Sequence, residues 1–159
     1  MSGSRRRATF PLGEMNDKAV AIMERSEVKP IIEDLGGEAV VRDWVERFYG
    51  RITRDSLLAP LFPEDITESR DKQMAFFVEF FGGPALYSEQ YGQPFLRYRH
   101  RKVKIGRPER DAWMALLMES LREITADNDL IRKVEEKVGA MADHMINHRP
   151  DQKDAMYFN

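Results

Sequence analysis

The feature that most constrains the fold is the helical spacing of apolar residues, which recurs between breaks made by glycine and proline. Apolar side chains three and four positions apart line one face of a helix. This spacing predicts long helices over residues 38–54 and 65–81, a third ending near Ile124, and a last one capped by Asp127 or Asn128. Strand-like alternation occurs only over residues 103–105. We therefore expect an all-α protein with about six helices.

Shorter elements are predicted from the glycines and prolines themselves. Proline is favoured in the first turn of a helix and glycine just after the last turn. A short helix is therefore expected between Pro30 and Gly36, and another from Pro94 to about Arg101. Residues 84–93 are expected to form an irregular loop, and apolar spacing favours a further short helix over residues 14–26.

Length and composition limit the class of protein. The chain has 159 residues, which is typical of one domain. We expect an extension over residues 1–29, the domain over 30–148 and a tail over 149–159.

A formal net charge of −2 gives no general attraction to nucleic acid. No apolar run approaches the ~18 residues of a membrane span, and no secretory leader is recognisable. The chain has no cysteine, which excludes disulfides and thiolate metal sites. We expect a cytoplasmic protein that binds neither nucleic acid nor membranes.

Polar side chains interrupt the apolar stripe of the helix predicted over residues 65–81. Ser69 and Gln73 occupy the same helical face as Phe76. A buried amide without a partner costs about 1–3 kcal/mol, so another polar group should meet it. Tyr49 and Trp113 are the candidates, because each carries one polar hydrogen on an apolar body. These residues predict a polar cluster in an apolar cavity, and a plain buried hydrogen-bond network is the alternative.

Histidines are the other residues that could carry chemistry. His144 and His148 lie four positions apart, a spacing that can bind zinc, but a solvated helix end is the more common outcome. His100 lies among five cations in the sequence Leu96-Arg97-Tyr98-Arg99-His100-Arg101-Lys102-Val103-Lys104. One hypothesis is a strip that binds phosphate or nucleic acid, with Tyr98 available for stacking. Another is a neutral imidazole aimed inward while the cations surround an anionic cofactor. A satisfied core histidine is the commonest alternative.

Several stretches, in this order and at these spacings, resemble the group II truncated haemoglobins. They are Phe48-Tyr49, Leu57-Leu58-Ala59-Pro60-Leu61-Phe62-Pro63, Lys72-Gln73, Phe80-Phe81-Gly82-Gly83-Pro84-Ala85-Leu86-Tyr87-Ser88-Glu89, Leu96-Arg97-Tyr98-Arg99-His100 with Ile105-Gly106, and Arg110-Asp111-Ala112-Trp113. The resemblance covers roughly residues 31–148. After its histidine the family usually has an apolar, proline-containing stretch, whereas this chain has Arg101-Lys102-Val103-Lys104.

The resemblance implies a truncated globin fold, a two-on-two helical sandwich around haem b (iron protoporphyrin IX). His100 is then the proximal iron ligand. The distal polar residues are Tyr49, Gln73 and Trp113, with Ser69 at the distal gate. The porphyrin is walled by Phe62, Phe76, Leu96 and Ile105, with Val103 in place of a phenylalanine. Arg99, with Lys72 and Tyr87 as further candidates, is expected at the haem propionates.

The resemblance also implies reversible binding of dioxygen and other small gaseous or anionic ligands at the iron. Oxygen handling, nitric oxide dioxygenation and peroxide reduction are all compatible with it, as are a reductase partner and a monomeric or homodimeric state. A hypothesis from another class is a haem-free helical module that binds an acidic partner or nucleic acid through residues 97–104.

Overall fold

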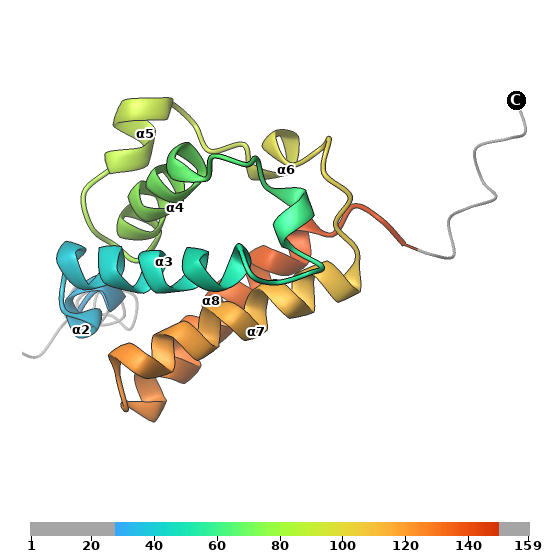
Figure 1. The fold of residues 1–159 in the computed structure, drawn as a ribbon. Coiled ribbons are helices and arrows are strands. Elements are labelled where there is room, and N and C mark those ends of the chain that lie inside the picture. The colour runs from blue at the N-terminus through green and yellow to red at the C-terminus, as the bar shows by residue number, and fades with distance from the viewer. Residues whose placement is uncertain (1–27, 150–159) are drawn as a thin grey trace, which may run out of the picture.

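The computed structural model describes residues 28–149, and every regular element in that range is helical. Figure 1 shows the order of these elements. They are α2 (Ile31–Leu35), α3 (Glu38–Ile52), the 3-10 turn η1 (Ala59–Leu61), α4 (Thr67–Phe80), α5 (Leu86–Tyr91), α6 (Leu96–Arg99), α7 (Arg107–Ile124) and α8 (Asn128–Met145). The all-α class is confirmed. The helix predicted over residues 14–26 lies outside the described residues.

Two pairs of long helices form the body of the protein. α3 packs against α4 in one pair and α7 packs against α8 in the other, while α3 also contacts α7 and so joins the pairs. Figure 1 shows α3 and α4 on one side of the molecule and α7 and α8 on the other. The short helices α5 and α6 follow α4, and α6 reaches α8. Among residues 28–149, no helix combines the length and apolar character that crossing a bilayer requires.

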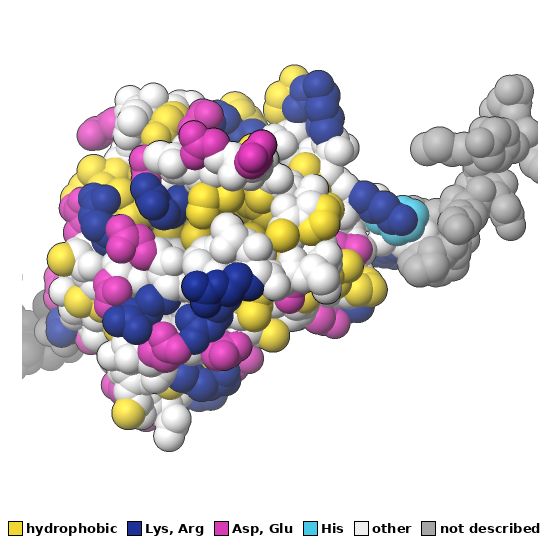
Figure 2. All heavy atoms as spheres, viewed as in Figure 1, with side chains coloured by type: hydrophobic (Ala, Val, Ile, Leu, Met, Phe, Trp, Pro, Cys, Tyr) yellow, Lys and Arg dark blue, Asp and Glu magenta, His cyan; other side chains and the backbone are white. Residues whose placement is uncertain are grey.

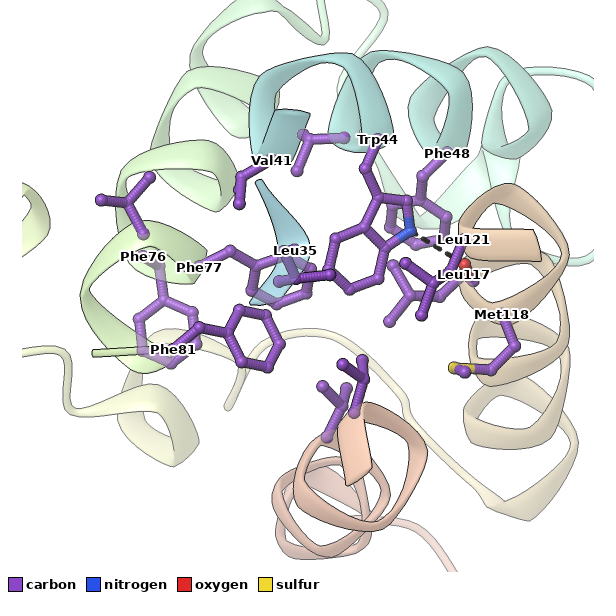
Figure 3. Packing of buried hydrophobic residues seen from close by; sticks show 14 of the residues in the cluster. Leu35, Val41, Trp44, Phe48, Phe76, Phe77, Phe81, Leu117, Met118 and Leu121 are labelled. Atoms are coloured by element: carbon purple, nitrogen blue, oxygen red, sulfur yellow. Dashed lines mark hydrogen bonds between the residues drawn. The ribbon is translucent and has the colours of Figure 1, made fainter. Parts of the chain in front are cut away.

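Trp44 is the centre of the core between the two pairs. It is fully buried on α3, and its ring centroid lies 5.1 Å from that of Phe77 and 5.8 Å from that of Phe81. On its other side, Trp44 Nε1 donates a hydrogen bond of 3.0 Å to the carbonyl of Leu117 on α7 (Figure 3). One side chain therefore contacts both helix pairs and satisfies its own buried polar hydrogen.

The predicted helix caps are correct in part. Asp127 precedes α8 and its carboxylate accepts hydrogen bonds from the N–H groups of Asp129 and Leu130, as an N-cap should. Asp65 accepts from the N–H of Thr67, but α4 begins only at Thr67 and ends at Phe80. These differences of one or two residues are ordinary fraying at helix ends.

The prediction of an irregular loop over residues 84–93 is wrong, because α5 spans Leu86–Tyr91. Contacts with α4 hold this helix in place. The Glu79 carboxylate accepts hydrogen bonds from the N–H and Oγ of Ser88, at 2.8 and 2.5 Å, and Tyr87 is buried against Phe76. Tertiary packing therefore stabilises a helix that six residues could not form alone.

The second short helix ends earlier than predicted. α6 spans only Leu96–Arg99, with His100 as its C-cap rather than an interior residue. Phe95, just before it, has φ 39°, the only positive φ at a non-glycine residue in the described chain. Left-handed backbone is costly for a bulky residue and requires support from its surroundings. The chain around His100 is therefore a tightly bent segment rather than a regular helix.

Candidate functional site

All the residues that the resemblance assigns to a haem site line one cavity of about 750 Å³. They are Tyr49, Phe62, Ser69, Lys72, Gln73, Phe76, Tyr87, Leu96, Arg99, His100, Val103, Ile105 and Trp113. They come from α3, the segment after η1, α4, α5, α6, the α6–α7 connection and α7. A volume of this size lies within the roughly 300–1,000 Å³ of small-molecule and cofactor sites. Figure 2 shows one face of the molecule, where hydrophobic side chains are visible in a hollow between α3 and α4.

One ring nitrogen of His100 is hydrogen-bonded, and the other has no partner among residues 28–149. Its Nδ1 lies 2.7 Å from the carbonyl oxygen of Leu96, one turn earlier. A carbonyl only accepts hydrogen bonds, so Nδ1 carries a proton, and in the neutral imidazole Nε2 is then the nitrogen with the lone pair. A neutral imidazole oriented in this way by a backbone carbonyl is the usual form of a histidine that ligates a metal.

Tyr49 and Ser69 meet, but through the backbone of Ser69. The hydroxyl of Tyr49 donates to the Ser69 carbonyl at 3.1 Å. Tyr49 is only 3% exposed, and this burial raises the pKa of its phenol well above the ordinary value. The hydroxyl therefore stays protonated, and its one hydrogen already has an acceptor in the protein.

Gln73 and Trp113 differ from Tyr49 in this respect. They line the same cavity from α4 and α7, and both are half-buried. The Trp113 ring packs edge-on against Phe48, with centroids 5.3 Å apart. Within residues 28–149, no protein group accepts a hydrogen bond from the Gln73 amide or from Trp113 Nε1. The cavity thus contains two kinds of polar hydrogen that a bound group could use.

Aromatic rings give the cavity a rigid apolar wall. Phe76 stacks on Phe80 and meets Tyr87 edge-on, with centroid separations of 5.3 and 5.8 Å. Phe62 meets Tyr49 edge-on at 5.8 Å. Flat, packed rings of this kind suit a flat apolar ligand better than a flexible polar one.

The cations at the cavity are partly engaged by the protein. Arg99 Nε donates to the Pro94 carbonyl at 2.8 Å, and its Nη2 lies 3.1 and 3.4 Å from the carbonyls of Tyr91 and Gln93. Lys72 Nζ lies 2.5 Å from a carboxylate oxygen of Glu68. Both side chains still line the cavity, but Arg99 also organises the α5–α6 loop, which the sequence did not indicate.

Residues of α7 and α8 also line the cavity and were not predicted from the sequence. They are Glu109, Arg110, Met141, Ala142 and Met145. Arg110 belongs to the stretch that carries the resemblance, and Met141 and Met145 lie on the apolar stripe of α8, so both signals were present. The spacing alone could not separate a cavity wall from ordinary core.

The other two histidines do not lie on one helical face. His144 is exposed in the last turn of α8, whereas His148 follows the end of that helix. In the part of the chain that the structure describes, no group of three or more histidine, cysteine or acidic side chains could hold a metal ion.

The donor set of the cavity fits haem. Among the described residues, the cavity has one imidazole, whose Nε2 has no partner there, together with aromatic and aliphatic walls and arginine and lysine side chains. This set matches an iron porphyrin with two carboxylates. Polar hydrogens from Trp113 and Gln73 lie within the same space.

Known proteins that are similar in sequence to this chain are globins. The family model for bacterial-like globins matches residues 30–147. The group 2 truncated haemoglobin YjbI of Bacillus subtilis is 33% identical over 111 residues, which is 70% of this chain and 84% of that protein.

Solved structures of haemoglobins are also similar to this chain. The haemoglobin of the thermophilic phototroph Chloroflexus aurantiacus is 37% identical, with a TM-score of 0.72, over 76% of this chain and 100% of that one. The group II truncated haemoglobin of Bacillus anthracis is 32% identical, with a TM-score of 0.73, over 76% of this chain and 98% of that one. The chain therefore belongs to the bacterial-like globin family and, within it, resembles the group II truncated haemoglobins.

Proposed function

We propose that this protein binds haem b in the 750 Å³ cavity, with His100 as the only protein ligand of the iron, and there binds dioxygen and other small gaseous or anionic ligands. The observation that carries the proposal is the pairing of His100 Nδ1 with the Leu96 carbonyl, which leaves Nε2 as a lone-pair donor. Haem iron held by one histidine keeps a position open for a diatomic ligand.

The polar residues are assigned to the opposite side of the haem from His100. Dioxygen gains partial negative charge when it binds, and fixed donors in a dry cavity stabilise such charge. Trp113 is proposed as the main donor, because its Nε1 has no acceptor among the described residues. Gln73 is the second donor, and Tyr49 contributes less because its hydroxyl donates to the Ser69 carbonyl. Ser69 lies at the distal entrance in this proposal.

The remaining cavity residues are assigned to binding the porphyrin. Phe62, Phe76, Leu96, Val103 and Ile105 would wall it. Arg99, Lys72 and Tyr87 would lie toward the propionates. Because Arg99 already donates to backbone carbonyls, its share of that role is small, and it acts mainly by fixing the loop.

Nitric oxide dioxygenation and peroxide reduction require a supply of electrons for turnover and therefore a reductase, whereas oxygen handling by reversible binding does not. The basic segment 97–104 is the proposed docking surface. Phe95 and Tyr98 are 66% and 63% exposed, and Figure 2 shows Lys and Arg side chains beside hydrophobic ones over the α6 region. In the described part of the chain, no lysine or arginine of segment 97–104 forms a salt bridge with an acidic side chain. An acidic surface would complement these cations.

The alternative function uses the same segment without haem. A helical module that binds an acidic protein or nucleic acid through residues 97–104 is favoured by the same exposed cations and aromatic rings. The chain's net charge of −2 argues against nucleic acid as the partner.

A cytoplasmic location and the choice between monomer and homodimer stay predictions, as do the boundaries of the extension and tail.

Two measurements separate these functions. The purified protein, titrated with haemin, is expected to bind one equivalent and develop a Soret band with the spectrum of histidine ligation. A protein that stays colourless would overturn the proposal. Binding to random-sequence DNA at physiological salt is expected to be no tighter than the ~10⁻⁴–10⁻⁶ M of nonspecific association. Tighter binding would instead support the interaction module.

A further inference from the structure

A residue beyond the last helix is joined to the segment that carries His100. Asn147 lies two positions after the end of α8 at Met145, and 47 positions after His100. Its Nδ2 donates to the carbonyl of His100 at 3.2 Å and to the carbonyl of Val103 at 2.8 Å. Its Oδ1 accepts from the N–H of Ile105 at 2.9 Å. The side-chain amide therefore bonds to the α6–α7 connection at three points.

The backbone strengthens the same junction. The N–H groups of Asn147 and His148 both donate to the Ile105 carbonyl, at 2.9 and 3.0 Å. The two segments approach so closely that a Cβ on Gly106 would lie 3.4 Å from the His148 carbonyl oxygen. The contact is thus a paired junction between two segments rather than a single chance hydrogen bond.

Only an amide side chain can make this set of bonds. Asparagine has two donor hydrogens and one acceptor oxygen, and all of them are used here. An aspartate of the same shape would have no donors and would place a carboxylate against two carbonyl oxygens. Glutamine would carry the amide one methylene too far from the backbone.

The α6–α7 connection has little else to hold it. α6 has only four residues, none of them buried, and Arg101, Lys102 and Lys104 in the connection are exposed. Val103 and Ile105 are half-buried, and the Val103 N–H donates to the His100 carbonyl at 3.0 Å. A segment with so little apolar burial opens easily unless hydrogen bonds restrain it.

We propose that Asn147 is a positioning residue, which fixes the backbone under His100 and thereby the place of the imidazole in the cavity. The inference rests on the proposed function, since it is the haem iron that the imidazole would reach. It also gives a role to the end of α8. Met141 and Met145 line the cavity, so Asn147 ties the ligand-bearing segment to the helix that forms another wall.

The test compares three variants of the full chain. Asn147→Ala removes all side-chain bonds, and Asn147→Asp keeps the shape but removes both donors. Asn128→Asp is the matched control, because Asn128 is exposed at the other end of α8. Haem transfer to an excess of a haem-scavenging apoglobin and the resonance Raman band of the iron–histidine bond are measured for each. Amide hydrogen exchange at Ile105 is measured on the haem-free proteins.

Both Asn147 variants are expected to lose haem about two- to tenfold faster than the wild type, the range that one net hydrogen bond supports. Their iron–histidine band should broaden or shift, and Ile105 should lose exchange protection in Asn147→Ala. Asn128→Asp should match the wild type. Unchanged haem loss and an unchanged band in both Asn147 variants would overturn the positioning role while leaving the proposed function intact. A wild-type protein that takes up no haem would overturn both.

Discussion

The imidazole of His100 is anchored to its own helix, with Nδ1 2.7 Å from the carbonyl oxygen of Leu96. This bond sets both the tautomer and the orientation of the ring. Because the acceptor is a backbone atom, no change of the Leu96 side chain would remove it. The histidine itself is therefore the place to test the proposed iron ligation.

His100→Ala is expected to abolish tight haem binding, because the other two histidines lie at or beyond the end of α8. His144→Ala removes an exposed side chain and should bind haem as the wild type does. Haemin titration followed by the Soret band measures both. If His100→Ala keeps a normal histidine-ligated spectrum, the ligand is another residue.

Trp44→Phe is expected to destabilise the fold without changing ligand binding. The substitution removes the 3.0 Å hydrogen bond to the Leu117 carbonyl and part of a fully buried ring. Loss of such a buried partner costs about 1–3 kcal/mol of unfolding free energy. Trp113→Phe is the matched control, because Trp113 is half-buried and bonds to no acceptor among residues 28–149.

Urea unfolding of both variants, followed by far-UV circular dichroism, provides the measurement. An equal loss of stability in the two variants would show that the Trp44 hydrogen bond adds nothing beyond ring volume.

The Glu79–Ser88 contact predicts a pH dependence. Hydrogen bonds from the Ser88 side chain and N–H lower the pKa of Glu79 below its ordinary value. A carboxyl whose pKa is lowered in the folded state stabilises the fold above its unfolded pKa, about 4.3 for glutamate. That stabilisation is lost as the pH falls through the folded pKa.

Ser88→Ala should therefore raise the pKa of Glu79 toward its ordinary value and destabilise the fold at pH 6 more than at pH 3. NMR titration of the Glu79 carboxyl and urea unfolding at the two pH values measure the effect. Ser56→Ala, at an exposed position, is the control. A stability difference that stays constant with pH would contradict this account of α5.

Local patterns were sufficient to predict the long helices, because each has an apolar stripe with the helical period. α5 was missed for a physical reason: it depends on Glu79 and on Tyr87 packing against α4 rather than on its own six residues. Every residue assigned to the haem site lines the cavity, but other lining residues of the same recognisable stretches, such as Leu58, Leu61 and Arg110, were not predicted. The hydrogen bonds of the polar cavity residues were not predicted, because Tyr49 and Arg99 donate to backbone carbonyls, and no sequence pattern indicates which carbonyl will be the acceptor. The role proposed for Asn147 has no sequence pattern that would predict it, and its contacts are visible only in the folded structure.

The hydrogen bonds of the proposed distal residues indicate which side chain controls the release of dioxygen. Trp113 Nε1 has no competing acceptor in the described residues, whereas the Tyr49 hydroxyl must leave the Ser69 carbonyl before it can donate to a ligand. A hydrogen bond to a charged acceptor contributes about 1.5–3 kcal/mol, and 1.4 kcal/mol is a factor of ten. Trp113→Phe should therefore speed dioxygen release roughly ten- to a hundredfold, and Tyr49→Phe should have a smaller effect.

Carbon monoxide separates this explanation from a change of cavity shape. It gains little charge on binding, so its release should change much less in Trp113→Phe, whereas a wider cavity would affect both gases alike. The double variant should be non-additive if the two donors share one ligand. Stopped-flow release rates for both gases decide the matter. A change below about threefold in both single variants would make the polar cluster structural. A larger effect of Tyr49→Phe than of Trp113→Phe would mean that the tyrosine hydroxyl turns from the Ser69 carbonyl to the ligand, which would reverse the order of donors proposed for this pocket.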